Sequence, residues 1–211
     1  MGAWIQTKRT QFDLEDPQPD MVFIEDIAEA LSKLCRFSGH CSTFYSVAEH
    51  SVRVCYGELN DANESVAWFE RHGLEGLLHD AAEAYIGDIT SPIKGLIPEI
   101  AVIERRIDAA IRERFGLPAE MSSAVAAADI RALAGEARQL FRGQHGMQWP
   151  QLEGFAWSTV VVRSHPTMSP MEAERLFYIC FECLFRGVCL PTQLPVEAQK
   201  GRRQSSRLES R

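Results

Sequence analysis

The chain has 211 residues, of which 45% are hydrophobic and 24% are charged, as is typical of a globular protein. This composition excludes a disordered chain, a fibre and a small disulfide scaffold, and the length suits one domain. The formal net charge is −7, and the 195–211 segment has five basic and two acidic residues, so residues 1–194 carry −10. An acidic body argues against broad nucleic-acid binding, because neutralising phosphates requires basic surface.

Neither the start of the chain nor its cysteines indicate export or membrane insertion. No stretch approaches the roughly 20 apolar residues that span a bilayer. The first seven residues, MGAWIQT, lack the apolar core of a signal peptide. The six cysteines lack the turn-rich spacing of a disulfide framework, and the Cys180-Phe-Glu-Cys183 motif suits a buried helix face better than a zinc or redox site. We therefore expect free thiols, a cytoplasmic location and no membrane partner.

Apolar residues recur at helical spacing along most of the chain, which predicts an all-α fold. A loop is expected at 88–95, strand-like alternation occurs only at 158–163, and we predict one domain over residues 1–194 with a basic, disordered tail at 195–211. A capping box with proline at the first helical position opens the last helix. Helices are expected at about 24–34, 47–59, 63–71 (ending at Gly73), 74–85 (ending at Gly87), 99–115, 119–141 and 169–185.

Metal-ligand residue types lie on three of these helices: His50, the pair His79-Asp80, and Asp129. Neighbouring residues of a helix project about 100° apart, so His79 and Asp80 can reach one point from two flanks. Two imidazoles and two carboxylates suit a divalent transition ion such as Mn, Co, Zn, Fe or Ni, with water in the remaining positions. Water bound to such an ion becomes acidic enough to supply hydroxide near neutral pH.

Each of these residues also has a structural interpretation. A lone histidine such as His50 is commonly a hydrogen-bonded core residue, and Asp129, after three alanines, could be an exposed helix residue or a cap. The His79-Asp80 pair is harder to explain this way, because it interrupts an apolar run. An ionised aspartate buried there needs a cation near it.

Six short motifs occur in a fixed order over roughly residues 24–142. They are Arg36-Phe37, Ala48-Glu49-His50-Ser51, Leu77-Leu78-His79-Asp80-Ala81-Ala82-Glu83, Gly87-Asp88-Ile89, Pro92-Ile93-Lys94 and Ala128-Asp129. In this combination the sequence resembles the HD-domain metal-dependent phosphohydrolases, and within them the branch of bacterial 5′-deoxynucleotidases and phage dATP triphosphohydrolases. The resemblance implies a compact HD-domain helical bundle, with the metal held by the residues matching His50, His79, Asp80 and Asp129.

The same resemblance assigns expected roles to residues around the metal. Glu83 and Asp88 match catalytic positions that assist proton transfer or hold a second ion, whereas on residue type alone Glu83 would be an exposed helix carboxylate and Asp88 the cap of a short turn. One helical turn would place Glu83 on the face of His79. Arg36 and Lys94 match phosphate-contacting positions, although by residue type alone both would be ordinary surface residues.

Aromatic and polar residues near Arg36 are candidates for the nucleoside part of the substrate. Phe37 could stack on a base where related enzymes often carry tryptophan. His40 and Tyr45 are weaker candidates for the same pocket. Because the residues before Asp129 are alanines, a basic ligand seen there in triphosphate-cleaving relatives is missing, and Arg53, Arg105 or Arg131 would have to replace it.

The expected function is metal-dependent hydrolysis of a phosphate ester of a small nucleotide, most consistent with a deoxyribonucleoside 5′-monophosphate. Removal of triphosphate from a dNTP is the alternative enzyme activity. A non-catalytic, metal-containing nucleotide sensor is the alternative of another class, and a nucleic-acid factor using the basic tail is a weaker one. Oligomerisation is left open, since the apolar helix at 171–190 could supply either an interface between copies or core.

Overall fold

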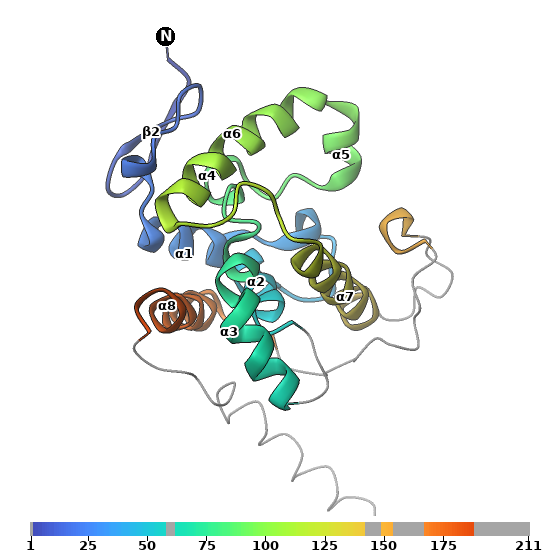
Figure 1. Ribbon diagram of the computed structural model, residues 1–211. Helices are drawn as coiled ribbons and strands as arrows, with labels where there is room; N and C mark the ends of the chain where they lie inside the picture. The colour runs from blue at the N-terminus through green and yellow to red at the C-terminus, as the bar shows by residue number, and fades with distance from the viewer. Residues whose placement is uncertain (1, 58–61, 142–148, 154–166, 188–211) are drawn as a thin grey trace, which may run out of the picture.

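In the computed structural model, which describes residues 2–57, 62–141, 149–153 and 167–187, nearly all regular structure is helical and the fold is all-α. Figure 1 shows the helices gathered around α2. The elements in chain order are β1 (Trp4–Gln6), β2 (Gln11–Asp13), η1 (Pro19–Met21), α1 (Ile24–Lys33), η2 (Arg36–Gly39), α2 (Val47–Cys55), α3 (Ala62–Leu78), α4 (Glu83–Ile86), α5 (Ser91–Leu96), α6 (Pro98–Phe115), α7 (Ser123–Leu140), η3 (Pro150–Leu152) and α8 (Pro170–Arg186).

Helix α2 is enclosed by its neighbours. It packs against α1, α3, α7 and α8, and every one of its residues except Arg53 is buried. Ser46 caps its start by accepting a hydrogen bond from the Glu49 amide. A helix buried on all sides holds its side chains in fixed positions, so His50 at its centre has a defined orientation.

The main core lies between α1, α2, α8, the end of α3 and parts of α4 and α6. A smaller cluster joins α2 to α7 through Val54, Val125, Ala128 and Ala132, with Trp68 of α3 packed against it. The small side chains of Ala128 and Ala132 let α7 approach closely, which brings Asp129 toward α2 and α3.

Helix α8 begins at the predicted capping box. The Ser169 hydroxyl accepts a hydrogen bond from the Glu172 amide, and the Glu172 carboxylate accepts one from the Ser169 amide at 2.8 Å. Cys180 and Cys183 are free thiols buried in the core, as expected for a helix face. One face of α8 is therefore core, while Met171, Ile179 and Phe185 remain exposed.

Several predicted boundaries are wrong. Gly73 does not interrupt its helix; it lies within α3, where a Cβ would meet the Leu184 side chain at 3.1 Å, so glycine allows close packing on α8. The helix predicted for 74–85 is in fact two helices, because α3 ends at Leu78 and turns joining residues three apart lead into α4. Gly87 ends α4 with φ +84°, as predicted.

Other differences concern short elements. The predicted loop at 88–95 contains α5, because Pro92 occupies its first turn instead of breaking it. The helix predicted from 119 begins at Ser123, since Ser122 caps it. The hairpin of β1 and β2 was not predicted because three-residue strands show no clear alternation, and it is anchored by Phe12, which stacks on Tyr85. The strand predicted at 158–163 and the tail at 195–211 lie outside the described residues.

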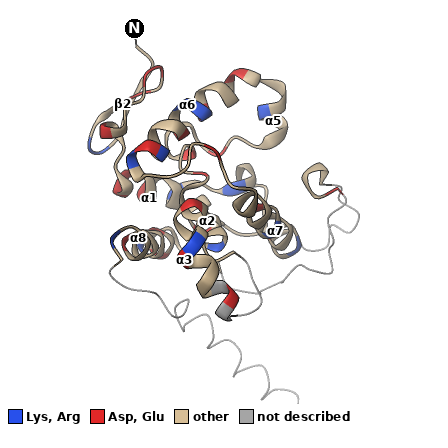
Figure 2. Cartoon of the chain, in the orientation of Figure 1, with Lys and Arg blue, Asp and Glu red and all other residues tan. Residues whose placement is uncertain are grey.

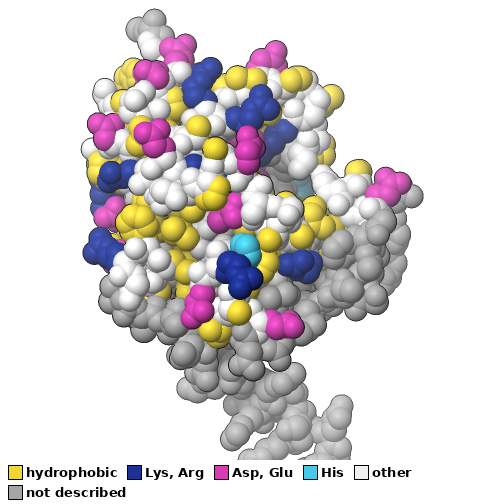
Figure 3. Space-filling model, in the orientation of Figure 1, with side chains coloured by type: hydrophobic (Ala, Val, Ile, Leu, Met, Phe, Trp, Pro, Cys, Tyr) yellow, Lys and Arg dark blue, Asp and Glu magenta, His cyan; other side chains and the backbone are white. Residues whose placement is uncertain are grey.

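Charged residues of both signs are distributed over the surface. Acidic and basic residues are interspersed along α6 (Figure 2). On the face drawn in Figure 3, the described residues form no continuous basic patch. In the part of the chain that the structure describes, no helix is long and apolar enough to cross a membrane.

A single glycine tests how closely α3 must approach α2. A Cβ on Gly76 would lie 3.0 Å from the Val54 carbonyl oxygen and 3.2 Å from its carbon, which are backbone atoms that cannot rotate away. We expect Gly76→Ala to lower the free energy of unfolding by roughly 1–3 kcal/mol, even though alanine is the better helix former. Urea denaturation measures this difference.

Gly95→Ala in α5 is the matched control, because no atom lies within 4 Å of the added methyl group. We expect its stability to be unchanged or higher by up to about 1 kcal/mol. Equal stabilities for the two variants would show that the approach of α3 to α2 does not depend on Gly76.

Candidate metal centre

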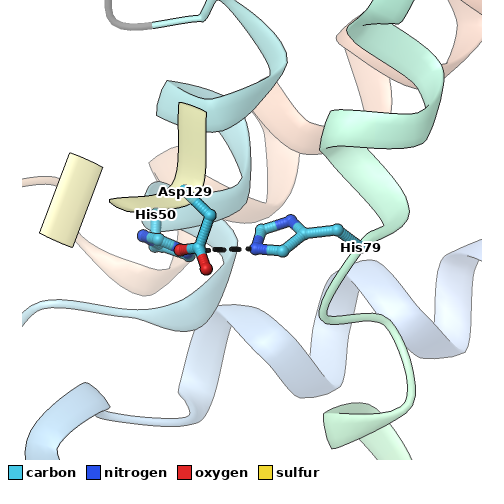
Figure 4. Close-up of side chains that lie close together, drawn as sticks. All are labelled: His50, His79 and Asp129. Atoms are coloured by element: carbon cyan, nitrogen blue, oxygen red, sulfur yellow. Dashed lines mark hydrogen bonds and ion pairs between the residues drawn. The ribbon is translucent and has the colours of Figure 1, made fainter. Parts of the chain in front are cut away.

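Three ligand-type side chains from three helical segments meet at one point (Figure 4). His50 comes from α2, His79 follows the last residue of α3, and Asp129 comes from α7. The His50 Nε2 atom lies 3.2 Å from His79 Nε2 and 3.1 Å from Asp129 Oδ1, and His79 Nε2 lies 3.8 Å from the same oxygen. Donors bound to one transition ion at roughly 2.1 Å lie about 3.0–3.4 Å apart, so these three could hold an ion with little movement.

Asp80 lies beside the two histidines of this group. Its Oδ2 atom lies 3.2 Å from His79 Nε2 and 3.5 Å from His50 Nε2. The structure therefore brings His50, His79 and Asp129 to one point, and Asp80, the fourth predicted ligand, lies beside the two histidines. The set of two imidazole nitrogens and two carboxylate oxygens is one that Mn, Fe, Co, Ni and Zn all accept.

The outer nitrogens of both histidines are already engaged. His50 Nδ1 lies 2.6 Å from Glu136 Oε1, and His79 Nδ1 lies 2.8 Å from the Gly76 carbonyl oxygen. Carboxylates and carbonyls only accept hydrogen bonds, so each Nδ1 carries a proton, and a ring that is neutral presents its Nε2 lone pair inward. Two neutral rings with their lone pairs 3.2 Å apart, beside two carboxylates, would leave acceptors facing acceptors unless a cation or bound protons lie between them.

The charges around this point raise the pKa of the two histidines and lower the pKa of the two aspartates. Burial alone would lower the pKa of His50 and His79, but the nearby carboxylates outweigh it and raise both. Burial alone would raise the pKa of Asp80 and Asp129, but the facing histidines hold both well below the usual range. The four shifts show that protonated histidines and ionised carboxylates stabilise one another here.

Glu83 and Asp88 lie beside this centre. Burial, together with the charges of Asp80 and Asp88, raises the pKa of Glu83 to about 9, against the opposing effect of Arg36 and Lys94. Burial also raises the pKa of Asp88. One buried oxygen of each carboxylate, Glu83 Oε2 and Asp88 Oδ2, has no hydrogen-bond partner among the described residues. The prediction that a continuous helical turn joins His79 to Glu83 is wrong, because residues 79–82 form turns between α3 and α4.

Two basic side chains reach the same region. Arg36 is largely buried, with NH1 3.5 Å from Asp80 Oδ2 and NH2 3.3 Å from Glu136 Oε2. Lys94 Nζ lies 2.6 Å from Glu104 Oε1 and 3.6 Å from Glu83 Oε1. Both predicted phosphate contacts are therefore close to the acidic side chains of the centre.

Phe37 lies in an aromatic cluster and not among the ligands. Its ring makes edge contacts with Phe141 at 5.1 Å and Trp149 at 5.8 Å, and the Arg36 guanidinium lies 5.3 Å from its centroid. The backbone of Phe37 has φ +58°, which is uncommon for a residue with a bulky side chain. The structure thus places Phe37 next to the predicted phosphate contact Arg36.

Two residues of the site were not predicted in their observed places. Tyr45, a candidate for the substrate pocket, is fully buried and donates a hydrogen bond of 2.9 Å to Glu136 Oε1, whereas His40 is exposed. Glu136 was missed altogether, although it lies two helical turns after Asp129 among alanines and a glycine, a place where a carboxylate needs partners. Its burial raises its pKa, but Arg36 and His50 outweigh that effect and hold the value at about 2.

Comparisons with known proteins place the chain among relatives. No family model matches the sequence. It is 46% identical over 135 residues to the uncharacterized protein YfdR of Escherichia coli K12, and the aligned region covers 64% of this chain and 70% of that protein. It is 33% identical over 192 residues to the uncharacterized protein RCAP_rcc00048 of Rhodobacter capsulatus, which covers 90% of this chain and 86% of that protein. The chain therefore belongs to the protein family that contains YfdR and RCAP_rcc00048.

Proposed function

We propose that this chain is an HD-domain-type, metal-dependent phosphohydrolase that cleaves the phosphate ester of a small nucleotide, with a deoxyribonucleoside 5′-monophosphate as its substrate. The observation that carries the proposal is the pair of inward-facing Nε2 atoms 3.2 Å apart, each with its Nδ1 engaged, beside the carboxylates of Asp80 and Asp129. Packing alone does not require two imidazoles and two carboxylates to converge, whereas a divalent ion does.

His50, His79, Asp80 and Asp129 would hold the ion. A divalent ion bound there supplies Lewis acidity toward a phosphoryl oxygen and acidifies a water molecule for in-line attack. The chain itself supplies the charge that receives the phosphate: Arg36 offers a planar pair of donors and Lys94 a mobile ammonium. To contact substrate, Lys94 would exchange its ion pairs with Glu104 and Glu83 for one with the phosphate.

Glu83 is the residue best placed to move a proton. It is buried, and its Oε2 atom has no partner among the described residues. Its pKa of about 9 keeps it protonated at neutral pH in the metal-free protein, and a nearby divalent cation would lower that value. A carboxyl group tuned in this way can deliver a proton to the leaving oxygen or take one from the attacking water.

The balance of charge favours a monophosphate over a triphosphate. Near the four ligand residues, the described structure places two basic side chains, those of Arg36 and Lys94. The other candidates are engaged or exposed: Arg53 pairs with Glu49 at 3.3 Å, Arg131 stacks on Trp68, and Arg105 is exposed on α6. A triphosphate carries about four negative charges, and two bases beside several carboxylates compensate them poorly.

The identity of the substrate rests on the resemblance to HD-domain enzymes and on the aromatic cluster around Phe37. A base stacked on Phe37 would leave its phosphate near Arg36, since the two residues are adjacent. The proposal includes a cytoplasmic location, where nucleotides of this kind are found. A nucleotide sensor without catalysis is the alternative, and it is disfavoured by Glu83 and Asp88, because binding an anionic ligand does not need two buried carboxyl groups beside it.

Metal binding has a direct thermal signature. We expect Mn²⁺ or Co²⁺ at 100 times its Kd to stabilise the protein by about 2.7 kcal/mol, which raises Tm by roughly 5–10 °C for a domain of this size. Asp129→Asn should lose this shift while keeping most of the stability of the metal-free protein. Differential scanning calorimetry with and without chelator measures both effects, and an unchanged Tm at saturating metal would contradict the metal centre.

Glu83→Gln separates proton transfer from metal binding. We expect kcat on a deoxyribonucleoside 5′-monophosphate to fall roughly 10²–10⁴-fold, because the amide cannot exchange a proton, with metal affinity retained. Glu113→Gln, an exposed carboxylate on α6, is the control and should keep full activity. Retention of full activity by Glu83→Gln would remove Glu83 from the chemistry.

A substrate panel decides the number of phosphates. Metal-loaded protein incubated with dAMP, the other deoxyribonucleoside monophosphates and dATP should release inorganic phosphate from the monophosphates faster than triphosphate from dATP. Asp80→Ala should abolish turnover. Release of triphosphate as the main product would favour the triphosphohydrolase, and no cleavage of any nucleotide by metal-loaded protein would favour the sensor.

A further inference from the structure

Glu136 lies next to the candidate metal centre and contacts the side chains of His50, Tyr45 and Arg36. It is fully buried on α7, and its Oε1 atom lies 2.6 Å from His50 Nδ1 and 2.9 Å from the Tyr45 hydroxyl. Its Oε2 atom lies 3.3 Å from Arg36 NH2. One carboxylate therefore accepts a hydrogen bond from a candidate metal-ligand histidine with one oxygen and forms an ion pair with a basic side chain of the site through the other.

The contact with His50 decides which nitrogen faces the metal position. Because the ionised carboxylate accepts from Nδ1–H, the proton stays on the outer nitrogen and the Nε2 lone pair points inward. The negative charge also makes the imidazole a more basic ligand. Tyr45 lies on the segment that leads into α2 and is fully buried. Its hydroxyl donates a hydrogen bond to the same carboxylate and so restricts the position of Glu136.

The ion pair with Arg36 favours a position of the guanidinium next to the metal position. Arg36 is held between Glu136 on one side and Asp80, a metal ligand, on the other. Its long side chain would otherwise lose rotational freedom on meeting an anion, which weakens binding. With Glu136 in place, the guanidinium is already oriented when phosphate arrives.

We infer that Glu136 is a positioning residue that serves both subsites, fixing His50 for the metal and Arg36 for the phosphate of the substrate. The inference rests on the proposed function but concerns a residue that touches neither the ion nor the substrate. It makes a specific statement about binding, namely that loss of one carboxylate weakens metal and phosphate binding together.

The test measures both affinities directly. Cobalt binding to the metal-free full chain is followed by visible absorption, and inorganic phosphate binding to the cobalt-saturated protein by calorimetry. We expect Glu136→Gln to raise the Kd for Co²⁺ about 10–100-fold, since outer-shell partners of metal ligands have effects of this size. At saturating cobalt we expect the Kd for phosphate to rise roughly tenfold, because the amide no longer anchors a charged donor.

Two further variants separate positioning from a general loss of structure. Glu49→Gln changes an equally buried carboxylate on α2, which contacts Arg53 and the Met168 amide but no ligand side chain, and should leave both Kd values near those of the unaltered chain. Glu136→Asp keeps the charge but shortens the reach, so it should fold and still weaken cobalt binding if contact with Nδ1 matters.

Each outcome bears on a different part of the argument. Unchanged cobalt affinity in Glu136→Gln, or an equal loss in Glu49→Gln, would overturn the inference, as would unchanged phosphate affinity at saturating cobalt. Absence of cobalt binding by the unaltered chain would overturn the metal centre and the inference with it. Weakened binding of both ions in a protein that cleaves no nucleotide would leave the inference standing and remove the proposed hydrolase.

Discussion

The structure depends on an unfavourable meeting of acceptors. Two imidazole Nε2 atoms face each other at 3.2 Å with two carboxylates beside them, and the histidines are almost completely buried. In a low-dielectric interior such an arrangement destabilises the fold unless a cation or bound protons compensate it. The packing of α2 against α1, α3, α7 and α8 keeps the rings from turning away, so the apolar core maintains an arrangement that the polar groups alone would not adopt.

Small residues make that enclosure close enough to be useful. Gly76 brings the last turn of α3 against the backbone of Val54 in α2, and its own carbonyl oxygen, near a helix end, accepts a hydrogen bond from His79 Nδ1–H. Ala128 plays a similar part on α7, immediately before Asp129. The residues that set the distances between helices are thus direct neighbours of the residues that face the candidate ion.

The sequence predicted the helices well where apolar residues recur over several turns or where a cap is present, as at α1, α6 and the capping box of α8. It also predicted His50, His79 and Asp129, which the structure brings to one point, and Asp80, which lies beside the two histidines. It failed where a few residues decide the conformation: at the hairpin around Phe12, at Gly73, which lies within α3, and at the short α5. Glu136 was overlooked because a glutamate on a helix is usually solvated, and only its alanine and glycine neighbours indicated burial. Contacts such as those of Arg36 with Asp80 and Glu136 depend on rotamers and on helix crossing, which no local pattern specifies.

The most informative failure is the end of α3. On a continuous helix, His79 and Asp80 would project about 100° apart and could meet an ion only from two flanks. In the structure the helix has already ended at Leu78, and the Ala81 and Glu83 amides donate to carbonyls three residues earlier. This turn brings His79 Nε2 and Asp80 Oδ2 to 3.2 Å from each other. It also places the Glu83 carboxyl group close enough to Asp80 for the Asp80 charge to raise its pKa. Local helical preference gives way at the residues that carry the proposed chemistry, because a ligand pair and a proton carrier must face one point within five residues of chain.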